Sequence, residues 1–139
     1  MAWESYNLDQ FAHDLVLKYR DKKNGKVSVL NQTHKMRMTV AYGLERFWGE
    51  HLRLDGDKAE YWKDTWKTLA EILFDAGVKL PNDEIKSDRD TAAIKSMTDK
   101  LWTFDIQQRK IALAVLTQLC DCMVWWTQRY KITRGEADE

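Results

Sequence analysis

The chain has 139 residues, of which 44% are hydrophobic and 32% charged, and its formal net charge is zero. This length fits one domain with a buried core, and the composition excludes a chain that is disordered throughout. No apolar stretch approaches the roughly 20 residues needed to cross a membrane, and the first residues lack the basic start and apolar run of a secretory signal. We therefore expect one cytoplasmic domain over residues 1–139, with a short acidic tail at about 133–139.

Five segments carry hydrophobic residues at the 3.6-residue spacing of an amphipathic α-helix. They cover about residues 4–21, 31–54, 57–76, 88–103 and 105–131. No segment shows the sustained alternation of a β-strand. The sequence therefore predicts an all-α, single-domain bundle of about five helices.

Residues with capping preferences mark several of these boundaries. The predicted N-caps are Asn31 for the second helix, Asp57 with Glu60 for the third, and Asp105 with Gln108 for the fifth. Gly77 is expected to end the third helix in the left-handed conformation, and Pro81 prevents its continuation. The turn between the first two helices is predicted at Asn24-Gly25.

The sequence shows no catalytic or metal-binding constellation. His13, His34 and His51 form no i, i+4 pair, and His51 beside an apolar face is expected to be structural. Cys120 and Cys122 lie about 200° apart on a helix, so they are expected to be reduced thiols that share neither a disulfide nor a metal. We expect no enzyme activity, no metal site and no cofactor.

One segment is strongly basic although the whole chain is neutral. Between positions 18 and 37 there is one acid, Asp21, and seven cations: Lys18, Arg20, Lys22, Lys23, Lys26, Lys35 and Arg37. Lysines around a turn can neutralise phosphates without reading bases. A solvated loop is the alternative, and Lys18 also suits the helix dipole. Four further candidate contacts lie near the two ends of the last predicted helix: Arg109, Lys110, Arg129 and Lys131.

Seven tryptophans form a large share of the aromatic surface. Trp62, Trp66 and Trp126 lie on apolar stripes and are expected in the core. Trp125 instead shares a polar face with Gln118 and Asp121. We interpret this face as a protein interface; stacking on a nucleic-acid base and coverage of a small satellite cluster are the alternatives.

Three segments resemble the small helical subunit of type III CRISPR effector complexes, especially the Cmr type. They are residues 116–119 (Leu-Thr-Gln-Leu), 126–130 (Trp-Thr-Gln-Arg-Tyr) and 42–47 (Tyr-Gly-Leu-Glu-Arg-Phe). Segment order, length and helical character fit that family over most of the chain.

The resemblance implies a non-catalytic subunit that stacks on copies of itself and on other effector subunits. Such subunits line the channel for guide RNA and target RNA and contact the backbones through lysine and arginine. A helical adaptor or regulatory protein that binds only proteins is the alternative from another class, and a small enzyme assembled from dispersed residues is a third.

Overall fold

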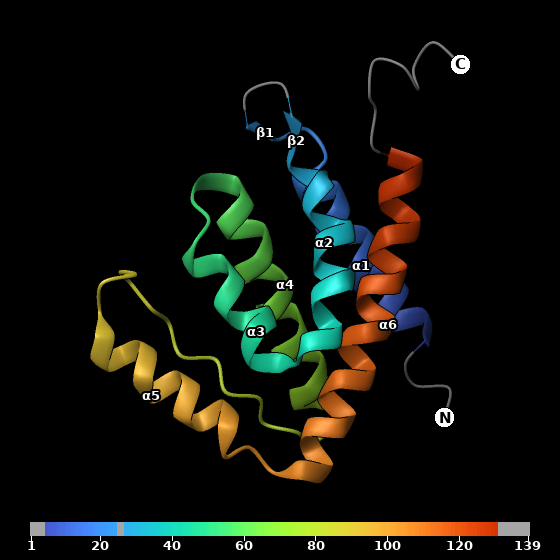
Figure 1. Cartoon of the computed structure of the whole chain (residues 1–139). Coiled ribbons are helices and arrows are strands. Elements are labelled where there is room, and N and C mark those ends of the chain that lie inside the picture. The colour runs from blue at the N-terminus through green and yellow to red at the C-terminus, as the bar shows by residue number, and fades with distance from the viewer. Residues whose placement is uncertain (1–4, 25–26, 131–139) are drawn as a thin grey trace.

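The computed structural model describes residues 5–24 and 27–130, and most of these are helical (Figure 1). The α-helices are α1 (Ser5–Tyr19), α2 (Gln32–Thr39), α3 (Leu44–Gly49), α4 (Gly56–Asp75), α5 (Thr91–Trp102) and α6 (Ile106–Tyr130). Single 3-10 turns η1 (Val29–Asn31), η2 (Val40–Tyr42) and η3 (Glu50–Leu52) flank α2 and α3. The all-α single-domain bundle is confirmed. The predicted helix ends at Glu4 and Lys131, and the tail at 133–139, lie outside the described residues.

The helices pack with alternating directions around α6. α1 and α6 lie side by side and run in the same direction, while α2 and α4 run the opposite way (Figure 1). Cross-helix hydrogen bonds fix this arrangement: the indole N–H of Trp126 donates to Asp9 on α1 at 2.8 Å, and Arg37 on α2 donates to Asp121 on α6 at 2.5 Å. In the described part, no helix is long and apolar enough for a membrane span.

The apolar stripes expected from the sequence meet in one core. Trp62 and Trp66 on α4 are each 2% exposed, and the ring of Phe47 lies 4.9 Å from that of Trp62. Both tryptophans therefore belong to the core, as predicted. Trp126 is half-buried and packs against the same core.

A chain of buried polar side chains crosses this core. Thr33 and Tyr61 share a hydrogen bond of 2.7 Å between their hydroxyls, and the Thr127 hydroxyl donates to Thr33 at 2.9 Å. Nearby, the Trp62 indole donates to the side-chain oxygen of Gln32 at 3.0 Å. Because unpaired buried polar groups are costly, these bonds fix how α2, α4 and α6 align.

The second predicted helix is wrong as a continuous element. The segment 31–54 is divided into α2, η2, α3 and η3, and the main break falls at Gly43. Gly43 has φ 103° and ψ 169°, a conformation that strongly favours glycine and turns the chain between η2 and α3. The Tyr-Gly-Leu segment therefore redirects the chain instead of continuing a helix.

Of two further predicted helix starts, one is confirmed in position and the other is corrected. Asn31 is in the N-cap position of α2, as predicted, although its side chain makes no capping bond. The preceding turn η1 is capped by Ser28, which accepts from the Leu30 N–H at 3.1 Å. The N-cap position of α4 is Asp55, not Asp57, and its side chain makes no capping bond.

Two other predicted boundaries are confirmed. Asp105 accepts from the Gln108 N–H at 3.0 Å at the start of α6. Gly77, with φ 85°, ends α4 in a Schellman motif, in which the Val78 N–H donates to the Leu73 carbonyl at 2.8 Å.

A minimal hairpin connects α1 to η1. Strands β1 (Lys23–Asn24) and β2 (Val27–Ser28) pair antiparallel. They are the only strands among the described residues. Asn24 of the predicted turn lies on β1, and Gly25 lies outside the described residues. This hairpin and the C-terminal end of α6 lie at the same end of the bundle (Figure 1), which brings two basic parts of the sequence close together.

Candidate nucleic-acid interface

Three cations of the basic segment 18–37 are paired with acids from other helices. Lys18 lies 2.7 Å from Asp64, and Lys22 lies 3.7 Å from Asp57, both acids being on α4. Arg37 forms its 2.5 Å ion pair with Asp121 on α6. The excess of positive charge along the sequence is therefore partly neutralised in space.

The Lys18 pair belongs to a small cluster with Tyr19. The Tyr19 hydroxyl also donates to Asp64, in a very short hydrogen bond. Burial and this bond to a carboxylate raise the pKa of Tyr19 well above its usual value, and the bond to Asp64 raises the pKa of Lys18. These groups connect α1 to α4 and are poorly suited to bind a phosphate.

Three other cations of the segment have no carboxylate partner among the described residues. Arg20, Lys23 and Lys35 are exposed, and they lie at the end of α1, on β1 and in the first turn of α2. Lys26 lies outside the described residues. The candidate phosphate contacts are thus concentrated at the hairpin end of the bundle.

The candidate cations of the last helix have different environments. Arg109 donates to Glu45 at 3.0 Å and to the Leu101 carbonyl, so it connects α6 with α3 and the end of α5. Lys110 is exposed without a carboxylate partner in the described part. Arg129 lies with its guanidinium carbon 3.7 Å from the Trp125 ring centroid. Lys131 lies beyond the described residues.

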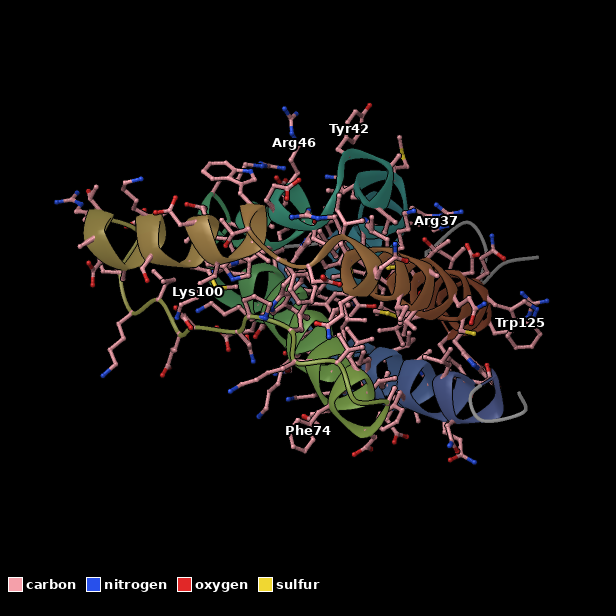
Figure 2. All side chains as sticks on the ribbon, turned by 90° about the horizontal axis from the view of Figure 1, so that it is seen from below. Arg37, Tyr42, Arg46, Phe74, Lys100 and Trp125 are labelled. Atoms are coloured by element: carbon pink, nitrogen blue, oxygen red, sulfur yellow. The ribbon has the colours of Figure 1, made fainter. Side chains whose placement is uncertain are left out.

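The polar face around Trp125 is exposed as expected. Trp125 is 48% exposed, and Gln118 and Asp121 are also exposed. However, Asp121 is engaged by Arg37 and the Trp125 ring by Arg129. Figure 2 shows Trp125 projecting from the end of α6, away from the bundle.

An aromatic cluster joins α1 and α6 beside this face, and the sequence analysis did not identify it. The Trp126 ring stacks on Tyr130 at 5.5 Å and meets the edge of Trp125 at 4.8 Å. His13 shares a 2.7 Å hydrogen bond with the Tyr130 hydroxyl, and Arg20 lies 5.4 Å from the Tyr130 ring. The i, i+4 spacing of Trp126 and Tyr130 is the sequence signal that could have indicated it.

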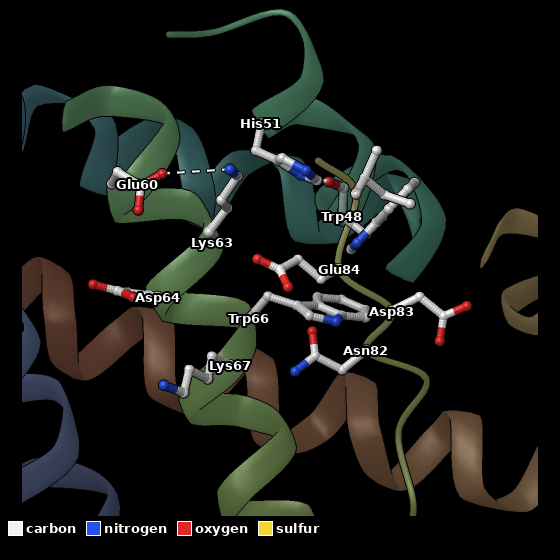
Figure 3. A pocket seen from close by; sticks show the side chains of 11 residues that line it. Trp48, His51, Glu60, Lys63, Asp64, Trp66, Lys67, Asn82, Asp83 and Glu84 are labelled. Carbon is white, nitrogen blue, oxygen red and sulfur yellow. Dashed lines mark hydrogen bonds and ion pairs between the residues drawn. The ribbon is translucent and has the colours of Figure 1, made fainter. Parts of the chain in front are cut away.

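A cleft of about 490 Å³ opens between η3, α4 and residues 82–85 (Figure 3). His51, 8% exposed, lines it and donates through Nδ1 to the Trp48 carbonyl at 2.5 Å. Burial lowers the pKa of His51, so the ring is neutral at pH 7. Lys63 at the rim is bound to Glu60 at 3.4 Å. His51 is thus buried and bonded to the backbone, which supports the prediction of a structural histidine.

The other groups that sequence analysis considered for chemistry are dispersed. Cys120 and Cys122 are free, and burial raises the pKa of both thiols. No group of three or more His, Cys, Asp or Glu side chains suited to a metal occurs in the residues that the structure describes.

Comparison with known proteins identifies no relative of this chain. No family model, no curated protein and no solved structure matches it.

Proposed function

We propose that this protein is a non-catalytic subunit that holds RNA by its phosphate backbone. The observation that carries the proposal is a group of cations at the hairpin end that pair with no carboxylate among the described residues. Arg20, Lys23 and Lys35 come from one part of the sequence and Arg129 from another, yet all four are exposed near the same end of the bundle. Exposed lysines and arginines bind phosphates through charge, and they release counterions on binding.

The proposed contact is independent of RNA sequence. The described cations sit at helix ends and on a two-residue strand. Backbone contacts of this kind position a nucleic acid but carry no base information. We therefore expect the protein to bind unrelated RNA sequences with similar affinity.

The finer proposal is a small structural subunit of an RNA-guided CRISPR effector complex. Its support is the resemblance of residues 42–47, 116–119 and 126–130 to the Cmr-type small subunit. In such a complex the partners are guide RNA, target RNA, other subunits and copies of this chain. Co-purification from the native host with a CRISPR RNA and effector proteins supports this assignment, and purification without either contradicts it.

The RNA proposal is tested by fluorescence anisotropy with two unrelated RNA oligonucleotides over a range of salt concentrations. The variant Arg20→Glu/Lys23→Glu/Lys35→Glu should bind both oligonucleotides more weakly and with a smaller salt dependence, because fewer counterions are released. Lys22 is left unchanged, since its reversal would also break the ion pair with Asp57.

The matched control reverses three exposed cations of the segment between α4 and α5: Lys79→Glu/Lys86→Glu/Arg89→Glu. It changes the net charge by the same amount but leaves the hairpin end intact. RNA affinity should change much less than in the first variant. Equal losses in both variants, or no binding by the wild-type protein, would contradict the proposed interface.

A protein-binding adaptor is the second candidate, and a different surface favours it. Met38 and Tyr42 are 70% and 66% exposed and lie four residues apart along α2 and η2. Tyr42 and Arg46 project from the same side of the molecule (Figure 2). If Met38→Ser/Tyr42→Ser disrupts self-association in sedimentation experiments while RNA binding by the wild type is absent, the adaptor function is favoured.

A further inference from the structure

Two arginines at the hairpin end are each placed over an aromatic ring. We propose that Arg20 and Arg129 are the principal phosphate-binding groups of this surface, and that Tyr130 and Trp125 hold their guanidinium groups in position. The inference rests on the proposed RNA function and assigns roles within that surface. Trp125 then acts first as a positioning residue for Arg129 and not as a subunit contact.

Arg129 is the more closely held of the two. Its guanidinium carbon lies 3.7 Å from the centroid of the Trp125 ring, and one of its nitrogens is 3.3 Å from the Trp125 carbonyl oxygen. The same nitrogen lies 3.4 Å from the side-chain oxygen of Gln128. These contacts restrict the side chain but use only one guanidinium nitrogen, which leaves other N–H donors for a ligand.

Arg20 is held by a ring that is itself fixed. It lies 5.4 Å from the Tyr130 ring. The Tyr130 hydroxyl is bonded to His13, and its ring stacks on Trp126 with an interplanar angle of 16°. Trp126 in turn donates to Asp9, so the platform under Arg20 is anchored to α1 through two side chains.

The rings beneath the two arginines belong to one aromatic cluster. They are connected through Trp126, which contacts both Trp125 and Tyr130 at centroid distances below 6 Å. Arg20 and Arg129 form no ion pair with a described carboxylate, whereas Arg37 nearby is bound by Asp121. The Asp9 carboxylate accepts a hydrogen bond from the Trp126 indole. Within residues 5–24 and 27–130, no carboxylate therefore neutralises Arg20 or Arg129.

The chemistry of the pair fits a phosphodiester. A guanidinium presents parallel N–H donors that match two phosphate oxygens, and it retains its charge throughout the physiological pH range. Stacking on a ring restricts its rotamers, so less side-chain entropy is lost when the phosphate binds. A lysine at the same position keeps the charge but has neither the fork nor the planar stacking.

The experiment measures affinity for a single-stranded oligouridylate, which has little structure of its own, by anisotropy. We expect Arg129→Lys and Trp125→Ala each to weaken binding by about 2- to 5-fold, the range of an exposed cation–π contact. Trp125→Phe should retain most of the affinity, because it keeps a ring under Arg129. The double variant Arg129→Lys/Trp125→Ala should lose no more than either single variant.

Arg20→Lys and Tyr130→Leu form the corresponding test at the second ring, with the same expectation. Arg46→Lys is the matched control, because Arg46 is exposed and has neither a ring contact nor an ion pair in the described residues. Its affinity should equal that of the wild type. Circular dichroism melts on each variant establish that the fold is retained.

The outcomes separate this inference from the proposed function. If the wild-type protein binds RNA but Arg129→Lys and Trp125→Ala bind equally well, the arginine pair is wrong and the broader function stands. Independent, additive losses in the double variant mean that Trp125 contacts RNA separately, which overturns its positioning role. If the wild type does not bind RNA at all, both fail.

Discussion

The imidazole of His51 is buried in the folded protein. In the unfolded chain the same ring is exposed to water and is protonated in mildly acidic solution. In the folded protein the ring is 8% exposed, and its Nδ1–H is donated to the Trp48 carbonyl. Burial is the main reason for the lowered pKa, and the positive charge of Lys63 acts in the same direction. The neutral ring is therefore a built-in source of acid sensitivity.

This sensitivity has a definite sign. Above the unfolded-state pKa of about 6.5, His51 is neutral in both states and contributes no pH dependence. Below that pH the unfolded chain binds a proton that the folded protein resists, so stability falls as pH falls, until the lowered folded pKa is reached. We expect the free energy of unfolding to decrease between pH 7 and pH 5.5.

Urea denaturation at several pH values measures this decrease. His51→Asn should be less stable at pH 7, because it disturbs the buried contact with Trp48, but its stability should depend less on pH over the same interval. His34→Gln is the comparison variant, since it also removes one imidazole but from an exposed position. An equal slope in His51→Asn and in the wild type contradicts the assignment.

The neighbouring residues Trp125 and Trp126 should respond very differently to truncation. Trp126 packs against the core and its indole N–H is bonded to Asp9. Trp126→Ala should therefore cost about 3 kcal/mol of folding stability or more. Trp125 is 48% exposed, and Trp125→Ala should leave thermal stability nearly unchanged. Thermal melts of both variants test the difference, and similar losses would place Trp125 in the core.

At the scale of elements, Gly43 controls the path between η2 and α3. Its φ of 103° is strained for any other residue, and an added Cβ would lie 2.6 Å from Oε1 of Glu45. That carboxylate is the one that binds Arg109. A side chain at position 43 would therefore strain the backbone and displace the ion pair that connects α3 to α6.

We expect Gly43→Ala to lower the free energy of unfolding by about 1–3 kcal/mol. Gly49→Ala is a matched control, because Gly49 has φ −67° and nothing within 4 Å of the added Cβ. That variant should be neutral or more stable by about 0.4–1 kcal/mol, since alanine has less freedom in the unfolded chain. Urea denaturation compares the two, and equal effects would show that the turn at Gly43 is not required.

The elements that sequence predicted correctly are those governed by local periodicity. The stripes of α4 and α6 are long enough that the 3.6-residue spacing determines both type and length. The segment 31–54 shows the same spacing, but the single residue Gly43 redirects it. Asn31 is in the N-cap position of α2 as its preference predicts, whereas the N-cap position of α4 is Asp55 and not the predicted Asp57; neither Asn31 nor Asp55 makes a side-chain capping bond.

At the scale of the whole molecule, the distribution of charge over the surface is the property that is hardest to predict from a short stretch of sequence. Asp57, Asp64 and Asp121 are far from the basic segment in sequence, but the fold brings each beside one of its cations. Lys18, Lys22 and Arg37 are therefore weaker candidates for phosphate contact than the sequence predicts, because each is already paired with a carboxylate. Conversely, the cluster around Tyr130 depends on α1 meeting α6, and only the spacing within α6 was visible beforehand.

The helices of this bundle differ in how many buried contacts they make with their neighbours, so their local stabilities should differ. α1, α2 and α4 all pack against α6, whereas α5 lies at the edge beside α3 (Figure 1). α5 buries only Met97 and Leu101 completely, and the ion pair of Lys100 with Asp83 at its end is exposed to solvent. Elements with few buried contacts open locally at a lower free energy than global unfolding costs.

We therefore expect hydrogen exchange, followed by mass spectrometry, to be faster in peptides of α5 than in peptides of α4 and α6. Met97→Ala should accelerate exchange in α5 further, because it removes a fully buried side chain whose sulfur also accepts from the Asp83 N–H at 3.4 Å. α1 and α6 should be much less affected, since separation of α5 from α3 leaves the α1–α6 interface buried. Protection of α5 equal to that of α4, or a uniform response to Met97→Ala across all helices, would mean that the bundle opens as one cooperative unit.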